Sequence, residues 1–172
     1  MIALQVLIYQ ATATCPEGWK ALPTSDSKCY LDYKWPDRKT FPEAKAQCES
    51  INAKLAEPLN EEENNAFTTA FKPFLQYWIG ISDQEEEKAF RYASDGSDVA
   101  YFSWNDDKEQ NKWPLHDCVA FKNGKWDTLH CTKQQRPFIC QMDMEQCPPG
   151  TFGFPECDEG KFQTNSLKVR RI

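Results

Sequence analysis

Cysteine is the residue of this chain whose number and spacing most directly suggest chemistry. Eight cysteines occur in 172 residues, at positions 15, 29, 48, 118, 131, 140, 147 and 157. Thiolates can bind zinc, but zinc modules usually contain C-x₂-C pairs, often with histidine partners. No such pair is present, and His116 and His130 are the only histidines. The cysteines therefore favour disulfide bonds formed in an oxidising compartment, with their pairing left open.

The sequence shows no pattern of catalytic residues. It contains no nucleophile beside a base, no glycine-rich phosphate loop and no carboxylate pair in a context that marks acid–base chemistry. The net charge is −6, and the only basic cluster along the sequence is Lys168, Arg170 and Arg171 in the tail. Nucleic-acid binding depends on clustered Lys and Arg. We therefore expect neither an enzyme nor a nucleic-acid-binding protein.

The length and the apolar content predict one folded domain with additional segments. Hydrophobic residues make up 40% of the chain, which is enough for a core. Residues 1–14 combine a short apolar stretch, 1–8, with a small-residue cleavage pattern at 11–13, and they predict a whole or partial secretory signal. The alternatives are an N-terminal strand or a truncated gene model. No other segment is long and apolar enough to span a membrane.

Two amphipathic helices are expected in the first half of the chain. Thr40 and Glu43 have the capping-box spacing, and Asn52 is a plausible left-handed end of that helix. Asn60 and Glu63 repeat the cap for a second helix that ends near Pro73. The predicted buried faces are Phe41, Ala44, Cys48 and Ile51 in the first helix, and Phe67, Ala70, Phe71 and Phe74 in the second.

The remaining chain has β character. A hairpin is expected over 15–31, with Cys15 and Cys29 facing each other, and an Asn123-Gly124 turn is expected to join two antiparallel strands. Short apolar runs predict further strands at 77–81, 90–92, 99–104, 118–121 and 138–140. Between Trp104 and Cys118 lies a long polar stretch, and long loops inside compact domains are usually functional. The pattern indicates an α+β domain with a long irregular loop.

The ordered set of motifs resembles the long form of the C-type lectin-like domain, which has an extra N-terminal hairpin. The resemblance covers about residues 15–142 and implies two helices, small antiparallel sheets and disulfide bridges. The residues that carry it are Cys15-Pro16, Gly18-Trp19, Cys48, Leu55-Ala56-Glu57, Trp78-Ile79-Gly80-Ile81, Ser94-Asp95-Gly96-Ser97, Trp104-Asn105, Asp117-Cys118-Val119, Gly124-Lys125-Trp126 and Pro137-Phe138-Ile139-Cys140. Trp78, Trp104 and Trp126 are expected in the core.

The resemblance also implies a disulfide pattern. The family's bridges correspond to Cys15–Cys29, Cys48–Cys140 and Cys118–Cys131 in this sequence. The remaining two cysteines, Cys147 and Cys157, are then expected to close a loop within an appendage and tail over residues 143–172.

In sugar-binding members of the family, one calcium ion is held by a Glu-Pro-Asn or Gln-Pro-Asp tripeptide, a later Glu and a Trp-Asn-Asp motif. The matching positions here are Glu109-Gln110-Asn111, His116 and Trp126-Asp127-Thr128. Glu109, Asn111 and Asp127 keep the oxygen donors that calcium prefers. Gln110 replaces the proline, and His116 and Thr128 each replace a carboxylate, so the resemblance implies a degenerate calcium site.

Three further acidic residues and one tryptophan complete the candidate site. Asp83, Glu87 and Asp117 match a second calcium site of the family, again without the ligand that His116 replaces. Trp113 could stack on the apolar face of a sugar, or it could pack under the loop.

Two functions follow from the resemblance. The first is a secreted, extracellular lectin that binds a glycan or glycoprotein through Glu109, Asn111, Trp113 and Asp127, with calcium weak or dispensable. The alternative is a calcium-independent module that recognises a protein ligand on the same fold.

Overall fold

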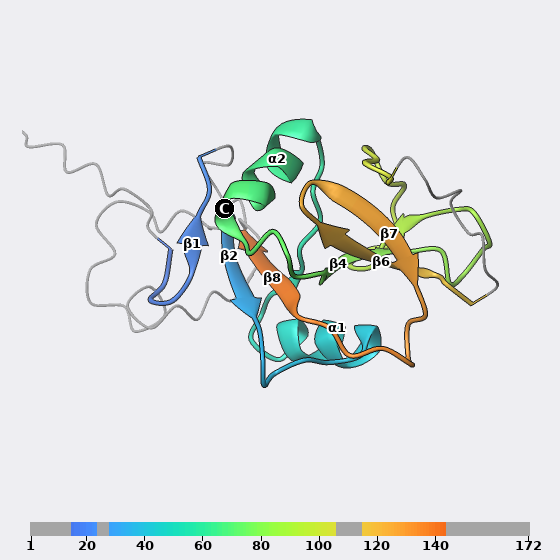
Figure 1. The fold of residues 1–172 in the computed structure, drawn as a ribbon, viewed down its shortest axis with the longest axis horizontal. Helices are drawn as coiled ribbons and strands as arrows, with labels where there is room; N and C mark the ends of the chain where they lie inside the picture. The colour runs from blue at the N-terminus through green and yellow to red at the C-terminus, as the bar shows by residue number, and fades with distance from the viewer. Residues whose placement is uncertain (1–14, 24–27, 106–114, 144–172) are drawn as a thin grey trace, which may run out of the picture.

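The described residues, 15–23, 28–105 and 115–143 of a computed structural model, form two helices and an eight-stranded sheet (Figure 1). The α+β prediction is confirmed. The helices are α1 (Phe41–Glu49) and α2 (Glu61–Ala70). The strands are β1 (Lys20–Ala21), β2 (Lys28–Tyr33), β3 (Lys54–Leu55), β4 (Tyr77–Ser82), β5 (Arg91–Tyr92), β6 (Cys118–Lys122), β7 (Lys125–Leu129) and β8 (Phe138–Asp143).

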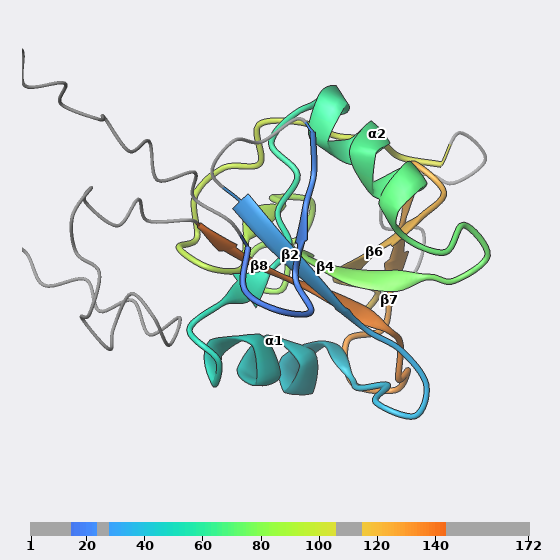
Figure 2. The same ribbon diagram turned by 90° about the vertical axis from the view of Figure 1, so that its left-hand side faces the viewer.

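The two helices lie on opposite sides of the sheet (Figure 2). The main strand order is β1-β2-β8-β4-β6-β7, while β3 pairs with β8 and β5 with β4. Pairing is antiparallel except between β4 and β8, which are parallel at Trp78 and Phe138. One core cluster contains Trp126 and Phe67 of α2, and the other contains Trp78 and Phe41 of α1. The sheet therefore separates two cores, and the predicted burial of Trp78 and Trp126 is confirmed.

The first helix follows its local sequence signals. The Glu43 carboxylate accepts hydrogen bonds from the Thr40 hydroxyl at 2.7 Å and from the Thr40 backbone N–H at 2.9 Å. These two hydrogen bonds lower the pKa of Glu43. Asn52 takes the left-handed conformation, with φ of 54°. The buried face is formed by Phe41, Ala44 and Cys48, as predicted, and Ile51 packs at its edge.

The second helix begins as predicted, but it ends before Phe74, the last residue of its predicted buried face. Asn60 caps it by accepting from the Glu63 N–H at 2.9 Å. Phe67 and Phe71 are buried, whereas Phe74 is 71% exposed. The helix ends at Ala70 and Phe71 is extended, so helical spacing no longer applies at position 74. The prediction for Phe74 was therefore wrong.

Residues 99–104 were predicted as a strand, and this prediction was wrong. Only Trp104 makes a β-bridge, to Trp126 of β7. Val99 is buried, and Tyr101 and Trp104 pack against the core around α2. Apolar side chains in this segment therefore contact the core without continuous backbone pairing, because no neighbouring strand runs along the whole segment.

The three disulfides implied by the resemblance are present. Cys48–Cys140 joins α1 to β8, Cys15–Cys29 ties the N-terminal segment to β2, and Cys118–Cys131 links β6 to the segment after β7. The expected Cys147–Cys157 pair, the signal segment 1–14 and the appendage beyond position 143 lie outside the described residues.

Candidate functional site

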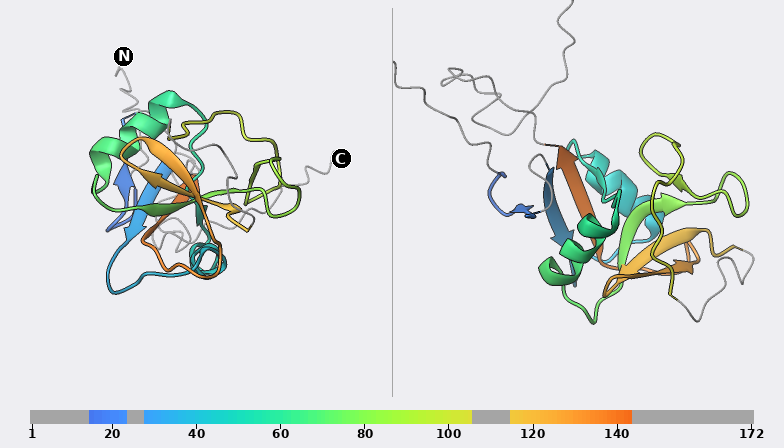
Figure 3. Two further views of the ribbon diagram at one scale, coloured as in Figure 1. Left: turned by 45° about the vertical axis from the view of Figure 1, so that its right-hand side comes forward. Right: turned by 90° about the horizontal axis from the view of Figure 1, so that it is seen from above.

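Asp127 is the one predicted glycan ligand among the described residues. It lies in β7 at the edge of the sheet farthest from β1 (Figure 3). Its two carboxylate oxygens accept hydrogen bonds from amide groups, one from Gln76 Nε2 at 3.0 Å and one from Asn105 Nδ2 at 3.4 Å. These donors fix the orientation of the carboxylate before any ligand arrives.

The segment that enters the long loop is attached to β7 next to Asp127. The Trp126 N–H donates to Ser103 O at 2.7 Å, and the Asn105 N–H donates to Trp126 O at 3.0 Å. Trp126 is completely buried and its Nε1 donates to Asn64 Oδ1 at 2.8 Å. Asn105, the last described residue before the loop, is therefore held beside the Asp127 carboxylate.

The other end of the loop is also fixed. The Asp83 N–H, directly after β4, donates to Asp117 O at 3.0 Å, and Cys118 is held by its disulfide to Cys131. Glu109, Asn111 and Trp113 belong to the chain between these two anchored ends. All three lie outside the described residues, so their predicted roles stay predictions.

The second predicted calcium set is only partly brought together. Asp83 is 3% exposed and accepts from the Lys88 N–H at 2.8 Å, whereas Glu87 is exposed. Burial and the nearby charge of Asp83 raise the pKa of Asp117, an effect opposed by His130 and His116. Asp83 and Asp117 are thus close enough to interact electrostatically.

The donors in the described ranges do not by themselves fit a calcium ion. No group of three or more His, Cys, Asp or Glu side chains that could hold a metal occurs within 15–23, 28–105 and 115–143. Calcium takes six to eight oxygen ligands. In the described ranges, the Asp83–Asp117 pair of the second predicted calcium site lacks a third carboxylate. Of the three predicted oxygen ligands of the first site, only Asp127 is described.

Sequence reasoning missed the residues that support Asp127. Asn105 was part of a recognised motif, but nothing in the sequence indicated that its amide would reach Asp127. Gln76 carried no signal at all, because it comes 51 residues before its partner. The contact exists only because β4 and β7 are separated by a single strand, β6.

A buried carboxylate was also missed. Glu57 is 2% exposed, and it accepts from Lys54 Nζ at 2.7 Å and from the Ser94 hydroxyl at 2.9 Å. A Cβ on Gly80 would lie 2.9 Å from Glu57 Cγ and 2.8 Å from Leu55 O, so this packing requires glycine at position 80. These contacts hold β3, β4 and the turn after β5 together.

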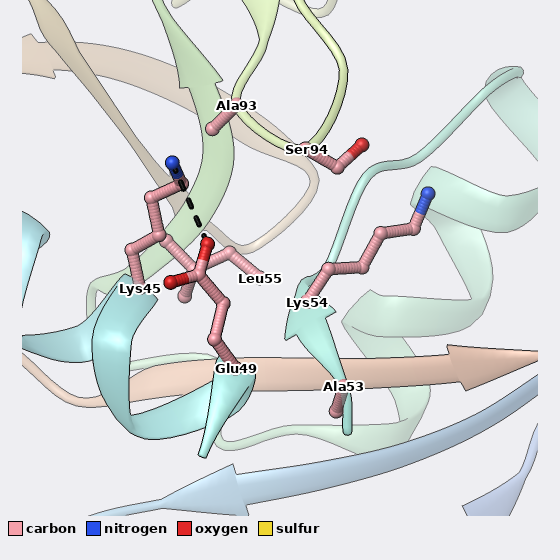
Figure 4. Close-up of a pocket in the computed structure, with 7 residues that line it drawn as sticks. All are labelled: Lys45, Glu49, Ala53, Lys54, Leu55, Ala93 and Ser94. Carbon is pink, nitrogen blue, oxygen red and sulfur yellow. Dashed lines mark ion pairs between the residues drawn. The ribbon is translucent and has the colours of Figure 1, made fainter. Parts of the chain in front are cut away.

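A separate pocket of about 230 Å³ lies at the C-terminal end of α1 (Figure 4). It is lined by Lys45, Glu49, Ala53, Lys54, Leu55, Ala93 and Ser94. Its two cations are already engaged, Lys45 by Glu49 at 3.5 Å and Lys54 by Glu57 at 2.7 Å. The pocket is therefore not suited to an anion.

The fold and its loop define a class of protein: a disulfide-linked α+β binding domain whose long polar loop is anchored at both ends to the sheet. Residues 37–142 match the family model described as the lectin C-type domain, and the chain belongs to this family. The resemblance predicted from the sequence is confirmed.

Two relatives are similar in sequence to this chain. A perlucin-like protein of Mytilus galloprovincialis is 31% identical over 137 residues, covering 76% of this chain and 84% of that protein. A mannose-binding protein of Gallus gallus is 35% identical over 99 residues, 57% of this chain and 38% of that protein. The chain thus spans well under half of the chicken protein.

A solved structure has the same fold. The carbohydrate-recognition domain of the mouse scavenger receptor C-type lectin matches with a TM-score of 0.67 and 28% identity, covering 77% of this chain and all of that domain. Within the described residues, neither helix has the length and apolarity needed to cross a membrane.

Proposed function

We propose that this protein is an extracellular lectin that binds a glycan or glycoprotein at the loop between Trp104 and Cys118. Glu109, Asn111 and Asp127 supply the polar contacts, and Trp113 stacks on the sugar. The observation that carries the proposal is the Asp127 carboxylate, which Gln76 and Asn105 hold beside the start of this loop.

The chemistry of these side chains suits a sugar. Carboxylates accept hydrogen bonds from hydroxyl groups, and carboxamides both accept and donate, so the three residues complement vicinal hydroxyls of a pyranose. Hydrogen bonds to a charged acceptor are the stronger ones, and a pre-oriented acceptor loses little freedom on binding. The apolar C–H face of the ring complements an indole.

The relatives and the cysteines support this proposal. The mouse domain is described as carbohydrate-recognising and the chicken protein as mannose-binding. Three disulfides within the described part of the chain are typical of an oxidising, extracellular environment.

We expect Asp127→Asn to weaken glycan binding about ten-fold or more, because hydrogen bonds to charged groups contribute roughly 1.5–3 kcal/mol each. Glycan-array binding should be measured with calcium and with EDTA, followed by titration of the best ligand. Asp143→Asn is the matched control, since it removes the same charge from an exposed position at the end of β8. Absence of any sugar signal in both conditions would overturn the proposal.

The second candidate is a calcium-independent module that recognises a protein. It is favoured by His116 and Thr128, which replace family ligands, by Gln110, which replaces the family's proline, and by the exposed position of Glu87.

A calcium titration followed by thermal unfolding tests the second candidate. If the ion is dispensable, we expect no saturable rise in the melting temperature at millimolar calcium, with magnesium as the control ion. A ligand that binds only the folded state raises stability by RT ln(1 + [L]/Kd), so a site with a Kd near 10 µM would add about 2.7 kcal/mol at 1 mM. A rise of that size, abolished by Asp127→Asn, would argue against the protein-recognition module.

A further inference from the structure

Two segments distant in the sequence form a basic surface beside the start of α1. Residues 34–39 connect β2 to α1, and residues 133–136 precede β8. They run side by side at the bottom of Figure 1 and at the lower right of Figure 2. Lys39 and Arg136 form an antiparallel β-bridge, in which the Lys39 N–H donates to Arg136 O at 3.0 Å and the Arg136 N–H donates to Lys39 O at 2.8 Å.

The bridge brings cationic side chains of both segments to one surface. Directly bridged residues in an antiparallel pair project to the same side, so Lys39 and Arg136 are neighbours there. We name the basic surface by its four cations: Arg38, Lys39, Lys133 and Arg136. The chain as a whole has a net charge of −6, so this concentration of positive charge contrasts with the rest of the molecule.

Few of these charges are neutralised within the protein. Lys34 belongs to the first segment but not to the basic surface, because its Nζ pairs at 2.6 Å with Asp32. That carboxylate also pairs at 2.9 Å with Lys20, whose Nζ donates to Ala70 O of α2. Among the described residues, no carboxylate lies within ion-pair distance of the four cations of the basic surface. Arg136 donates only to a neutral amide, from Nη2 to Gln134 Oε1 at 3.0 Å.

Two carboxylates lie nearby and leave the basic surface positive. Asp37 is exposed within the first segment. Glu43, at the start of α1, is held by Thr40 and feels the charge of Lys39. Four cations therefore face two carboxylates, one of which is already bound as a helix cap.

An exposed tryptophan lies within the basic surface. Trp35 is 77% exposed, and the Arg38 guanidinium lies 5.6 Å from the centre of its ring. An exposed indole offers an apolar ring face that can stack on the C–H face of a pyranose. A guanidinium beside it can bind an anionic oxygen group in a bidentate manner.

We propose that the basic surface binds sulfated polysaccharide, with Trp35 stacking on a sugar ring while Arg38, Lys39, Lys133 and Arg136 contact sulfate groups. A sulfated sugar combines an apolar ring face with several fixed negative charges, which matches a tryptophan surrounded by cations. Single-stranded nucleic acid fits less well, because such sites stack successive bases on several aromatic side chains. The disulfides also favour the extracellular space, where sulfated polysaccharides occur.

The experiment measures binding of a size-defined heparin fragment by calorimetry at several salt concentrations. The main variant is Arg38→Gln/Lys39→Gln/Arg136→Gln. The control, Lys72→Gln/Lys122→Gln/Lys125→Gln, removes the same charge from exposed positions elsewhere. Arg38→Gln/Lys133→Gln alters only exposed side chains and so tests the basic surface if the main variant is unstable.

We expect the main variant to bind heparin at least ten-fold more weakly. The slope of log K against log salt should also become shallower by about two to three, since each lost contact removes roughly one released counterion. Trp35→Ala should weaken heparin binding without changing the salt slope. Asp127→Asn should leave heparin binding unchanged. Equal loss in the control, absence of binding at physiological salt, or tighter binding to an oligonucleotide or to phosphatidylserine vesicles would overturn the proposal.

Discussion

Replacing both Cys48 and Cys140 by alanine is expected to lower the free energy of unfolding by roughly 4.5 kcal/mol. The bridge spans 92 residues of sequence, and closing so long a loop removes much conformational entropy from the unfolded chain. It also joins α1 to β8, so its loss frees the helix that covers one of the two cores. The measurement is denaturant unfolding under non-reducing conditions, with circular dichroism as the signal.

The Cys15→Ala/Cys29→Ala variant is the control, because its bridge closes only 14 residues. The same entropy relation gives roughly 3 kcal/mol for that loop. A larger loss for the short bridge than for the long one would contradict the explanation from loop entropy. It would indicate instead that the contacts between β1 and β2 dominate the stability.

Trp126→Ala is expected to destabilise the domain by about 3–5 kcal/mol, the usual range for removing a large aromatic side chain from a core. Trp126 is completely buried, and its ring contacts those of Tyr101, Phe102 and Trp104. The substitution also leaves Asn64 Oδ1 without its indole donor. Because Trp126 holds the segment that carries Asn105, glycan binding should weaken as well.

Two variants separate the contributions to this effect. Trp126→Phe keeps most of the aromatic volume but loses the hydrogen bond to Asn64, and we expect a loss of about 1–3 kcal/mol. Trp35→Ala removes the same side chain from a position that is 77% exposed, where changes within about 0.5 kcal/mol are usual. Equal destabilisation at positions 35 and 126 would rule out core packing as the cause.

The helix caps and the turn between β6 and β7 were predicted correctly from residues close together in the sequence. Thr40 and Glu43 lie within one helical turn, so their cap could be recognised from spacing alone. Asn123 and Gly124 both have positive φ, of 47° and 81°, and form the predicted turn between β6 and β7. The prediction for Phe74 failed because periodicity does not say where a helix ends.

The disulfides and the family came from the order of motifs along the chain. The fold and three of the four expected bridges follow from that resemblance and are present in the structure. The loop residues Glu109, Asn111 and Trp113 were identified in the same way, and the glycan-binding experiments above are their test.

The sequence by itself thus determined the family, the helix caps, the cysteine pairing of the domain and the candidate ligands, because each depends on local spacing or on the order of motifs. The tertiary structure alone decided that Gln76 and Asn105 fix the Asp127 carboxylate and that Glu57 is buried. It also brought Lys39 next to Arg136, 97 positions later, a neighbourhood that the sequence did not indicate. The physical reason is that sheet pairing sets which distant side chains become neighbours, and spacing along the chain carries no information about that pairing.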